Sequence, residues 1–224
     1  MELDLLREFP EFQNRLSHPA LNSLALRSLG CNVLATDIPT VISTVLNHNI
    51  ANNTVHCSAD SSFIEVRELD WTVHPNQWSW DNNKAIASHT PQPLPANEPT
   101  PRLKPPFDLI VSSDTLYIPS LTQPLLRTLH ALSVSSLSAS PPFARPPLIY
   151  ICIERRDPAL IDRTLQEARD IWNFRVNRIP SKKLARAMGK GGIDWVKSEW
   201  EDIEIWKLTL DGKLASNPDI VTVQ

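Results

Sequence analysis

The sequence predicts an α/β fold, with a mostly parallel β-sheet, helices on both of its faces and an antiparallel strand at one edge. Short apolar runs alternate along the chain with stretches of helical periodicity, and this order is typical of parallel sheets. The segment 107–117 is an apolar run that ends in a polar corner between prolines, which predicts a buried strand followed by a helix. The chain has 224 residues, enough for one domain with a buried core.

The first part of the chain alternates helix and strand. Leucines at positions 21, 24, 26 and 29 recur at helical spacing, and Gly30 supplies a stop signal. The apolar run that follows is closed by Asp37, and Pro39 stands where a second helix would begin. We therefore expect a helix over 19–29, a strand over 31–36, a helix from Pro39 to about Asn53 and a strand over 62–69.

The segment 72–106 differs from the rest in composition. It contains seven prolines between Pro91 and Pro106, among Asn, Thr, Ser and Gln residues, and such a segment cannot bury a core. It predicts an irregular surface insertion whose first part is held down by Trp78 and Trp80. The expected organisation is an atypical N-terminal segment over 1–18, one domain over 19–212 that carries this insertion, and a tail over 213–224.

Helical and strand periodicity continues beyond the insertion. Leucines at 121, 125, 129 and 132 predict a helix, and Asp157-Pro158 is typical of the start of another. We expect a helix over 119–133, a loose segment to 147, a strand over 148–153, a helix from 158 to about 172, a strand over 174–179, a short basic helix from 181 to about 189 and a strand over 203–210. The last two strands lack a long crossover, which predicts an antiparallel hairpin at the sheet edge.

Charge and cysteine content exclude several classes of function. The net charge of −3 argues against broad electrostatic binding to nucleic acid or to an anionic membrane. No apolar run approaches the roughly 18 residues of a membrane span. Cys31, Cys57 and Cys152 are an odd number without CxxC spacing, which favours buried thiols over disulfides or a metal site. We expect a monomeric cytoplasmic protein without a metal.

Acidic residues follow three of the predicted strands, where open α/β sheets bind ligands. Asp114 and Tyr117 lie three positions apart at one such corner, where an acid and a phenol suit chemistry. The alternative is that Asp114 only caps the next helix. Asp37 can accept both hydroxyls of a ribose, or it can cap a helix. Asp70-Trp71 suits an adenine, although a tryptophan at a strand end can also belong to the core.

Five short motifs follow one another along the chain: Thr36-Asp37-Ile38-Pro39, Asn49-Ile50 with Asn53, Leu69-Asp70-Trp71, Asp108-Leu-Ile-Val with Asp114-x-x-Tyr117, and Glu154-Arg155-Arg156. Together they resemble the family-16 seven-β-strand methyltransferases, over residues 19 to 210 without the insertion. The layout is most similar to the fungal enzymes that methylate a lysine of translation elongation factor 1-alpha. The resemblance implies a Rossmann-like sheet, S-adenosylmethionine as the cofactor and elongation factor 1-alpha as the protein substrate.

The resemblance also implies which residues hold the cofactor. Asp37 would bind the ribose of S-adenosylmethionine, and Asp70 and Trp71 would flank its adenine. Ser113 would line the cofactor wall through its backbone.

The substrate side of the implied site comes from the later motifs. Asp114 and Tyr117 would be the catalytic residues that face the incoming lysine. Glu154 and Arg155 would order the rim of the site, or they would form only a solvated ion pair.

The chain departs from the family at its N-terminal end. Members have a first strand that ends in a glycine-rich turn, whereas no glycine precedes Gly30 here. That strand is normally central, between the strands that end at Asp37 and at Ser112. Its absence would leave two strand edges without partners. We expect either that residues 1–6 fill the gap or that this N-terminus is not the natural one.

Two other functions stay open on the sequence. A protein-binding module of methyltransferase shape is favoured by the missing turn and opposed by Asp37, Trp71 and the Asp114–Tyr117 motif. A nicotinamide-dependent oxidoreductase also needs a glycine turn and gives no reason for the Asp114–Tyr117 motif, so it ranks below both.

Overall fold

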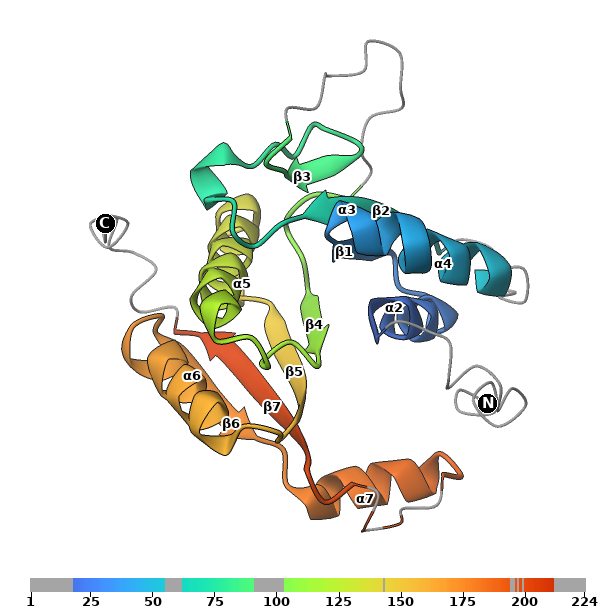
Figure 1. The fold of residues 1–224 in the computed structure, drawn as a ribbon, viewed down its shortest axis with the longest axis vertical. Coiled ribbons are helices and arrows are strands. Elements are labelled where there is room, and N and C mark those ends of the chain that lie inside the picture. The colour runs from blue at the N-terminus through green and yellow to red at the C-terminus, as the bar shows by residue number, and fades with distance from the viewer. Residues whose placement is uncertain are drawn as a thin grey trace. The chain divides into compact units, whose positions relative to one another are not determined.

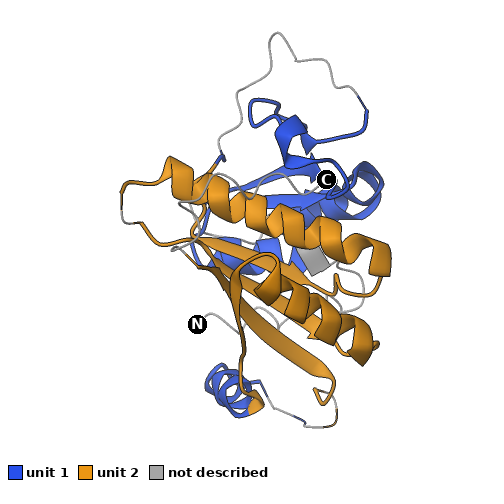
Figure 2. Ribbon diagram, turned by 90° about the vertical axis from the view of Figure 1, so that its left-hand side faces the viewer, with its two compact units in different colours: residues 1–104, 182–196 blue, residues 105–181, 197–224 orange. Residues whose placement is uncertain are grey.

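The computed structural model describes residues 18–54, 62–90, 103–142, 144–193, 196, 198 and 200–211. The chain divides into two compact units (Figure 2): unit 1 comprises residues 1–104 and 182–196, and unit 2 comprises residues 105–181 and 197–224. Each unit has its own β-sheet (Figure 1), so the α/β class is confirmed. Within the described ranges, no helix is both long and apolar enough to cross a membrane.

Unit 1 alternates helices and strands in the predicted order. Its elements are α2 (His18–Ser28), β1 (Val33–Asp37), α3 (Pro39–Val41), the π-helical η2 (Ile42–Leu46), α4 (Asn47–Thr54), β2 (Ile64–Leu69), the 3₁₀ helix η3 (Pro75–Gln77) and β3 (Ala85–Ala87). The sheet has the order β1-β2-β3 with parallel pairs throughout. The predicted second helix is therefore present, with a π-helical segment between its two α-helical parts.

The predicted stop of α2 at Gly30 is confirmed in its backbone. Gly30 has φ +87°, a left-handed conformation that costs a residue with a Cβ more than glycine. The amide of Gly30 donates to the carbonyl of Arg27 at 2.8 Å, and the amide of Cys31 donates to that of Leu26 at 3.1 Å. These two bonds form a Schellman motif, which satisfies carbonyls at the helix end and turns the chain into β1.

One apolar cluster of unit 1 joins α2, β1 and η2. Ala20 of α2, Ala35 of β1 and Leu46 of η2 are buried together, and partly buried aliphatic side chains pack around them: Ile42, Ile50, Ile64 and Val66. Further apolar side chains of the unit are buried elsewhere: Leu24, Val33, Leu69, Val73 and Ile86. Polar interactions add to this apolar burial.

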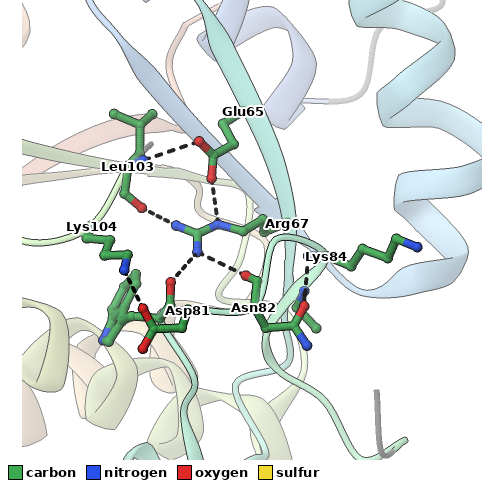
Figure 3. Close-up of polar contacts among 9 residues, drawn as sticks. Glu65, Arg67, Asp81, Asn82, Lys84, Leu103 and Lys104 are labelled. Carbon is green, nitrogen blue, oxygen red and sulfur yellow. Dashed lines mark hydrogen bonds and ion pairs between the residues drawn. The ribbon is translucent and has the colours of Figure 1, made fainter. Parts of the chain in front are cut away.

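A buried arginine supplies such interactions (Figure 3). The Arg67 side chain on β2 is completely buried, and its Nη1 donates to the carbonyls of Trp80 and Asn82 at 3.2 and 3.3 Å. Its Nη2 donates to the carbonyl of Leu103, and its Nε lies 3.0 Å from Oε1 of Glu65. This guanidinium thus connects β2 to both described ends of the proline-rich segment.

The same network explains a strand that the sequence analysis missed. Asn82 accepts hydrogen bonds at Oδ1 from the amides of Lys84 and Ala85, and this turn leads into β3, which pairs with β2. The prediction that Trp78 and Trp80 hold down the first part of the segment is confirmed. Their rings are 6.1 Å apart edge to face, and the Arg67 guanidinium lies 5.6 Å from the Trp80 ring. Residues 91–102, most of the proline-rich stretch, lie outside the described residues.

Unit 2 contains a four-stranded mixed sheet. Its elements are β4 (Leu109–Ser113), α5 (Pro119–Ala139), β5 (Leu148–Glu154), α6 (Pro158–Asp170), β6 (Phe174–Arg178) and β7 (Ile203–Leu210). Helix α7 (Ser181–Lys190) follows β6 in the chain but belongs to unit 1 from Lys182 onward, and no side chain of α7 is buried. Helix α5 continues six residues beyond the predicted end, so the first part of the expected loose segment is helical.

The sequence had predicted that the antiparallel strand lies at the edge of the sheet, and this prediction is wrong. The strand order is β4-β5-β7-β6, with β7 antiparallel to both β5 and β6. The predicted antiparallel pairing of the last two strands is confirmed, but β7 lies inside the sheet and β6 forms its edge. Trp206 of β7 pairs with Ile151 of β5 and with Arg178 of β6, so this alternating strand has a partner on each side.

One face of this sheet carries the core of unit 2. Ile149, Ile151 and Ile153 of β5 are at most 1% exposed, and Leu208 of β7 is fully buried. Figure 2 shows α5 and α6 on one side of the sheet, and buried leucines and isoleucine project from both helices: Leu125, Leu126, Leu129, Leu160, Ile161 and Leu165. Asp157 caps α6 as predicted, since its side chain accepts from the amide of Leu160 at 3.0 Å.

The strands form two sheets rather than one seven-stranded sheet. Strand β1 hydrogen-bonds only to β2, and β4 only to β5, among the strands of the described residues. These are the two strands that the sequence analysis expected to lose a partner. Leu109 and Val111 of β4 are 39% and 38% exposed, although both belong to an apolar run predicted to be buried. A single continuous sheet is therefore wrong for this structure, because no described strand pairs with these two edges.

Candidate functional site

A backbone corner at the end of β4 carries Asp114. The amide of Asp114 donates to the carbonyl of Cys152 at 2.9 Å, which extends the β4–β5 ladder by one residue. Asp114 then turns the chain with φ 50°, a conformation that costs most non-glycine residues about 1 kcal/mol or more. Helix α5 begins only at Pro119, behind Ile118, which provides no side-chain cap. The capping alternative for Asp114 is therefore wrong.

The Asp114 carboxylate faces a cation that the sequence analysis did not assign. Nη2 of Arg156 lies 3.4 Å from Oδ2 of Asp114. Arg156 also donates from Nε to Oε2 of Glu154 at 2.8 Å, and its Nη2 contacts the same oxygen. The hydrogen bond to Glu154 and then the charge of Asp114 raise the pKa of Arg156 above its ordinary value. The guanidinium thus bridges two carboxylates at the carboxyl ends of β4 and β5.

Arg155, which the sequence had offered as a rim residue, points elsewhere. Its guanidinium contacts Asp162 at 2.5 Å and the buried Glu204 at 3.0 Å. The predicted ion pair of Glu154 exists, but with Arg156 in place of Arg155. The alternation of side chains along a strand could have predicted this pairing, because residues 154 and 156 are on the same side of the chain and residue 155 is on the other.

Two further side chains belong to the same corner. Tyr117 is 56% exposed, and it lies near enough to Arg156 to raise the pKa of that guanidinium. Cys152 is half-buried, and burial together with the charge of Asp114 raises the pKa of its thiol, which keeps it protonated at neutral pH. Ser113 pairs with Cys152 across the β4–β5 ladder. Asp114, Tyr117 and Ser113 are therefore one group, as the sequence predicts.

Asp37 and Asp70 lie at the carboxyl ends of two adjacent parallel strands in unit 1. Asp37 pairs with Glu68, and Asp70 follows two residues later. Oδ1 of Asp37 accepts from the amide of Ile38 at 2.8 Å, while Oδ2 has no hydrogen-bond partner among the described residues. Helix α3 has Ile38 as its cap residue, without a side-chain bond, so the capping alternative for Asp37 is wrong too. Burial raises the pKa of the Asp37 carboxyl, against the opposing effect of the Ile38 amide.

Asp70 is part of a small polar cluster. Its Oδ1 accepts from the amide of Thr72 at 2.9 Å and from Oγ1 of Thr72 at 2.6 Å. Nε2 of His89 lies 2.7 Å from the same hydroxyl and 3.9 Å from Oδ2 of Asp70. Trp71 is half-buried rather than a core residue. The sequence did not predict Thr72 and His89 as partners of Asp70, since His89 is 19 residues from Asp70 and no local pattern links them.

The chemistry of the unit 1 residues fits a nucleoside. Oδ2 of Asp37 can accept from ribose hydroxyls. The Asp70 carboxylate can accept from an amine, and the neighbouring Trp71 indole can cover a ring face. In the described part of the chain, no group of His, Cys, Asp and Glu side chains is arranged to hold a metal ion. Asp37, Asp70 and Trp71 belong to unit 1, whereas Ser113, Asp114 and Tyr117 belong to unit 2. The prediction that both groups frame a single ligand stays a prediction.

Comparison with models of known protein families gave no match for this chain, and comparison with curated proteins gave none either. The residues themselves therefore carry the functional argument.

Proposed function

We propose that this protein is an S-adenosylmethionine-dependent protein-lysine N-methyltransferase of the cytoplasm that acts on elongation factor 1-alpha. The Asp114 corner is the observation that carries the proposal. A non-glycine residue held at φ 50° directly after a strand places a carboxylate, rather than a cap, at the ligand-binding edge of the sheet. Tyr117 stands exposed beside it, where its ring can meet a cationic side chain.

The unit 1 residues would hold the cofactor. Asp37 would accept from the ribose hydroxyls, while Asp70 and Trp71 would contact the adenine. When bound, S-adenosylmethionine supplies an activated methyl group on a positively charged sulfur. The chain's own part is to hold the nitrogen of the substrate lysine in line with that methyl group, and such alignment contributes most of the acceleration in reactions of this kind.

Asp114 has a second task, which concerns a proton. Lysine has a pKa near 10.4, so forming the neutral amine at pH 7 costs about 4 to 5 kcal/mol. A bare carboxylate would increase this cost, because it favours the ammonium form. The guanidinium of Arg156, 3.4 Å from Asp114, offsets that effect by bringing a positive charge to the same place. Asp114 can then orient the amine without fixing it in the charged form, and the proton leaves to solvent.

The test is methylation of purified elongation factor 1-alpha by the full chain with S-adenosylmethionine, followed by mass analysis of its lysines. Asp114→Asn should abolish transfer, because asparagine tolerates a positive φ but has no negative charge with which to orient the amine and help its proton leave. The matched control is Asp170→Asn, an exposed acid at the end of α6, which should leave the rate unchanged. Equal rates for wild type and Asp114→Asn would remove Asp114 from the mechanism.

The second candidate, a protein-binding module, is favoured by the two sheet edges at β1 and β4 that no described strand covers. A thermal-shift titration distinguishes the two functions. An enzyme should gain about 2.7 kcal/mol of stability at a cofactor concentration 100 times Kd. A binding module should show no shift with S-adenosylmethionine and should still bind elongation factor 1-alpha.

A further inference from the structure

A basic hollow lies on the sheet of unit 2, away from the Asp114 corner. It has a volume of about 410 Å³, and its cationic lining residues are Arg145, Arg175 and Lys207. Asn177 and Thr209 add polar side chains, and Leu148 contributes an apolar floor. Among the described residues, no acidic side chain lines the hollow. Such an unbalanced set of charges favours an anionic occupant.

The hollow opens on the sheet face opposite the core of unit 2. Leu148 alternates along β5 with the buried Ile149, so the two side chains point to opposite faces. Lys207 and Thr209 likewise alternate on β7 with the buried Leu208. The helices α5 and α6, whose buried leucines face the isoleucines of β5, are therefore on the other side of the sheet from this hollow.

The cations of the hollow are poorly neutralised. Arg145 and Lys207 make no side-chain hydrogen bond or ion pair with any described residue. Arg175 has one acidic neighbour, Asp211, whose Oδ2 lies 3.9 Å from its Nε, beyond hydrogen-bonding distance. The Arg175 side chain is 64% exposed. All three cations can therefore turn toward a ligand at little energetic cost.

The spacing of the cations fits an extended polypeptide. Arg175 pairs with Thr209 across the β6–β7 ladder, and Asn177 pairs with Lys207. Arg175 and Lys207 are thus diagonal neighbours, which places them about 7 to 8 Å apart. Side chains two residues apart on an extended chain are separated by about 6.6 Å and point the same way. Two acidic side chains at alternate positions would therefore meet both cations.

The backbone around the hollow does not suit a phosphate. Protein phosphate sites use unpaired amides at helix N-termini or in tight turns. Here β7 pairs with β5 on one side and β6 on the other, β6 pairs with β7 along its inner side, and Pro146 has no amide hydrogen. The hollow offers side-chain donors only, which carboxylates can meet one by one.

We propose that this basic hollow binds an extended acidic segment of a partner polypeptide, with carboxylates at alternate positions. The hollow is at the amino end of β5, and Glu154 is at its carboxyl end, about 20 Å away. The hollow is therefore a separate surface from the Asp114 corner. Its occupation does not depend on the proposed methyltransferase activity.

The test measures fluorescence anisotropy of a labelled peptide of four Glu alternating with four Thr, titrated with the full chain. The double variant Arg175→Gln/Lys207→Gln should weaken binding about tenfold, since each neutralised cation at an exposed site is worth up to about fivefold. The matched control is Arg163→Gln/Arg169→Gln, which removes the same charge from exposed positions of α6. This control should bind as wild type does, and circular dichroism should show all three proteins equally folded.

Three results would overturn the proposal. The first is a peptide of alternating Gln and Thr that binds as tightly as the acidic one. The second is an equal loss of affinity in both double variants, which would show only a response to net charge. The third is displacement of the peptide by sodium tripolyphosphate at concentrations below those of unlabelled peptide, which would make the hollow a phosphate site.

Discussion

Each unit buries charged side chains, and Arg67 and Glu204 are satisfied in opposite ways. Arg67 of unit 1 is fully buried; three backbone carbonyls accept hydrogen bonds from it, and one acid, Glu65, forms an ion pair with it. Glu204 of unit 2 is 4% exposed, and it is held mainly by cations, Arg155 at 3.0 Å and Arg178 at 3.1 Å. Unit 1 therefore relies on neutral dipoles, whereas unit 2 relies on opposite charges.

The same contrast divides the candidate site residues. Asp37 and Asp70 accept from neutral donors, an amide in one case and an amide with a hydroxyl in the other. Asp114 instead faces the Arg156 guanidinium. An acid that accepts only from neutral donors keeps its full negative charge and can accept from ligand hydroxyls. An acid beside a cation attracts an incoming ammonium ion less strongly. The contrast matches the proposed division between cofactor and substrate residues.

The largest expected effect concerns Arg67. Arg67→Met should lower the free energy of unfolding by about 3 to 5 kcal/mol, because Glu65 loses its buried cation and three carbonyls lose a buried donor. Urea denaturation monitored by tryptophan fluorescence measures this. The control Arg169→Met, at an exposed position of α6, should change stability by less than about 0.5 kcal/mol. A loss below about 1 kcal/mol for Arg67→Met would show that the network does not hold unit 1 together.

Glu204 provides the counterpart in unit 2. Glu204→Gln should cost about 1 to 3 kcal/mol, since the amide oxygen still accepts from Nε1 of Trp206 but no longer balances two arginines. Exposed Glu201→Gln is the matched control and should have little effect. If unit 2 relies on charge, added salt should reduce the difference in unfolding free energy between Glu204→Gln and wild type. This reduction should be larger than the change that salt causes in the cost of Arg67→Met. Equal salt responses would contradict the contrast between the units.

The contrast at the site predicts a shift in pH dependence. Arg156→Gln leaves Asp114 and Glu154 without their shared cation, so the substrate ammonium should lose its proton at higher pH. The alkaline rise in kcat/KM should move to higher pH, because a cation beside the reacting ammonium lowers the pKa of that ammonium. Arg156→Lys should restore the profile, whereas a purely structural role would change the rate without moving it.

The smallest effect concerns Asp37. Its pKa is raised by burial in the folded state, so its ionisation at neutral pH costs folding free energy. Asp37→Asn should therefore stabilise the protein at pH 7, by less than about 1 kcal/mol, while it weakens S-adenosylmethionine binding. The gain should disappear below pH 3.8, where the group is protonated in both states. Asp81→Asn is a control in which the stability should change in the opposite direction. Lys104 lowers the pKa of Asp81, so this substitution should reduce stability at pH 7.

Thermal melts across this pH range measure both Asp37→Asn and its control. A loss of stability in Asp37→Asn at pH 7 would mean that the bond from the Ile38 amide outweighs the cost of burial.

Several features could not be predicted because they depend on contacts between distant residues. β3 is an Ala-Ile-Ala segment too short for a periodic signal, and it forms where Asn82 and the Arg67 network hold it against β2. The pairing of Asp114 with Arg156 joins residues 42 positions apart and depends on the β4–β5 register. Strand β7 alternates as an edge strand would, yet it has a partner on each side.

The sequence by itself determined the helices, most of the strands and the positions of acids after strand ends, since these follow from local periodicity and from residues such as Gly30 and Pro119. The tertiary structure alone decided which strands pair, that the strands form two sheets, and which charges meet. Strand pairing and ion pairing join residues far apart in the chain, so their energies depend on packing and burial that no local pattern records.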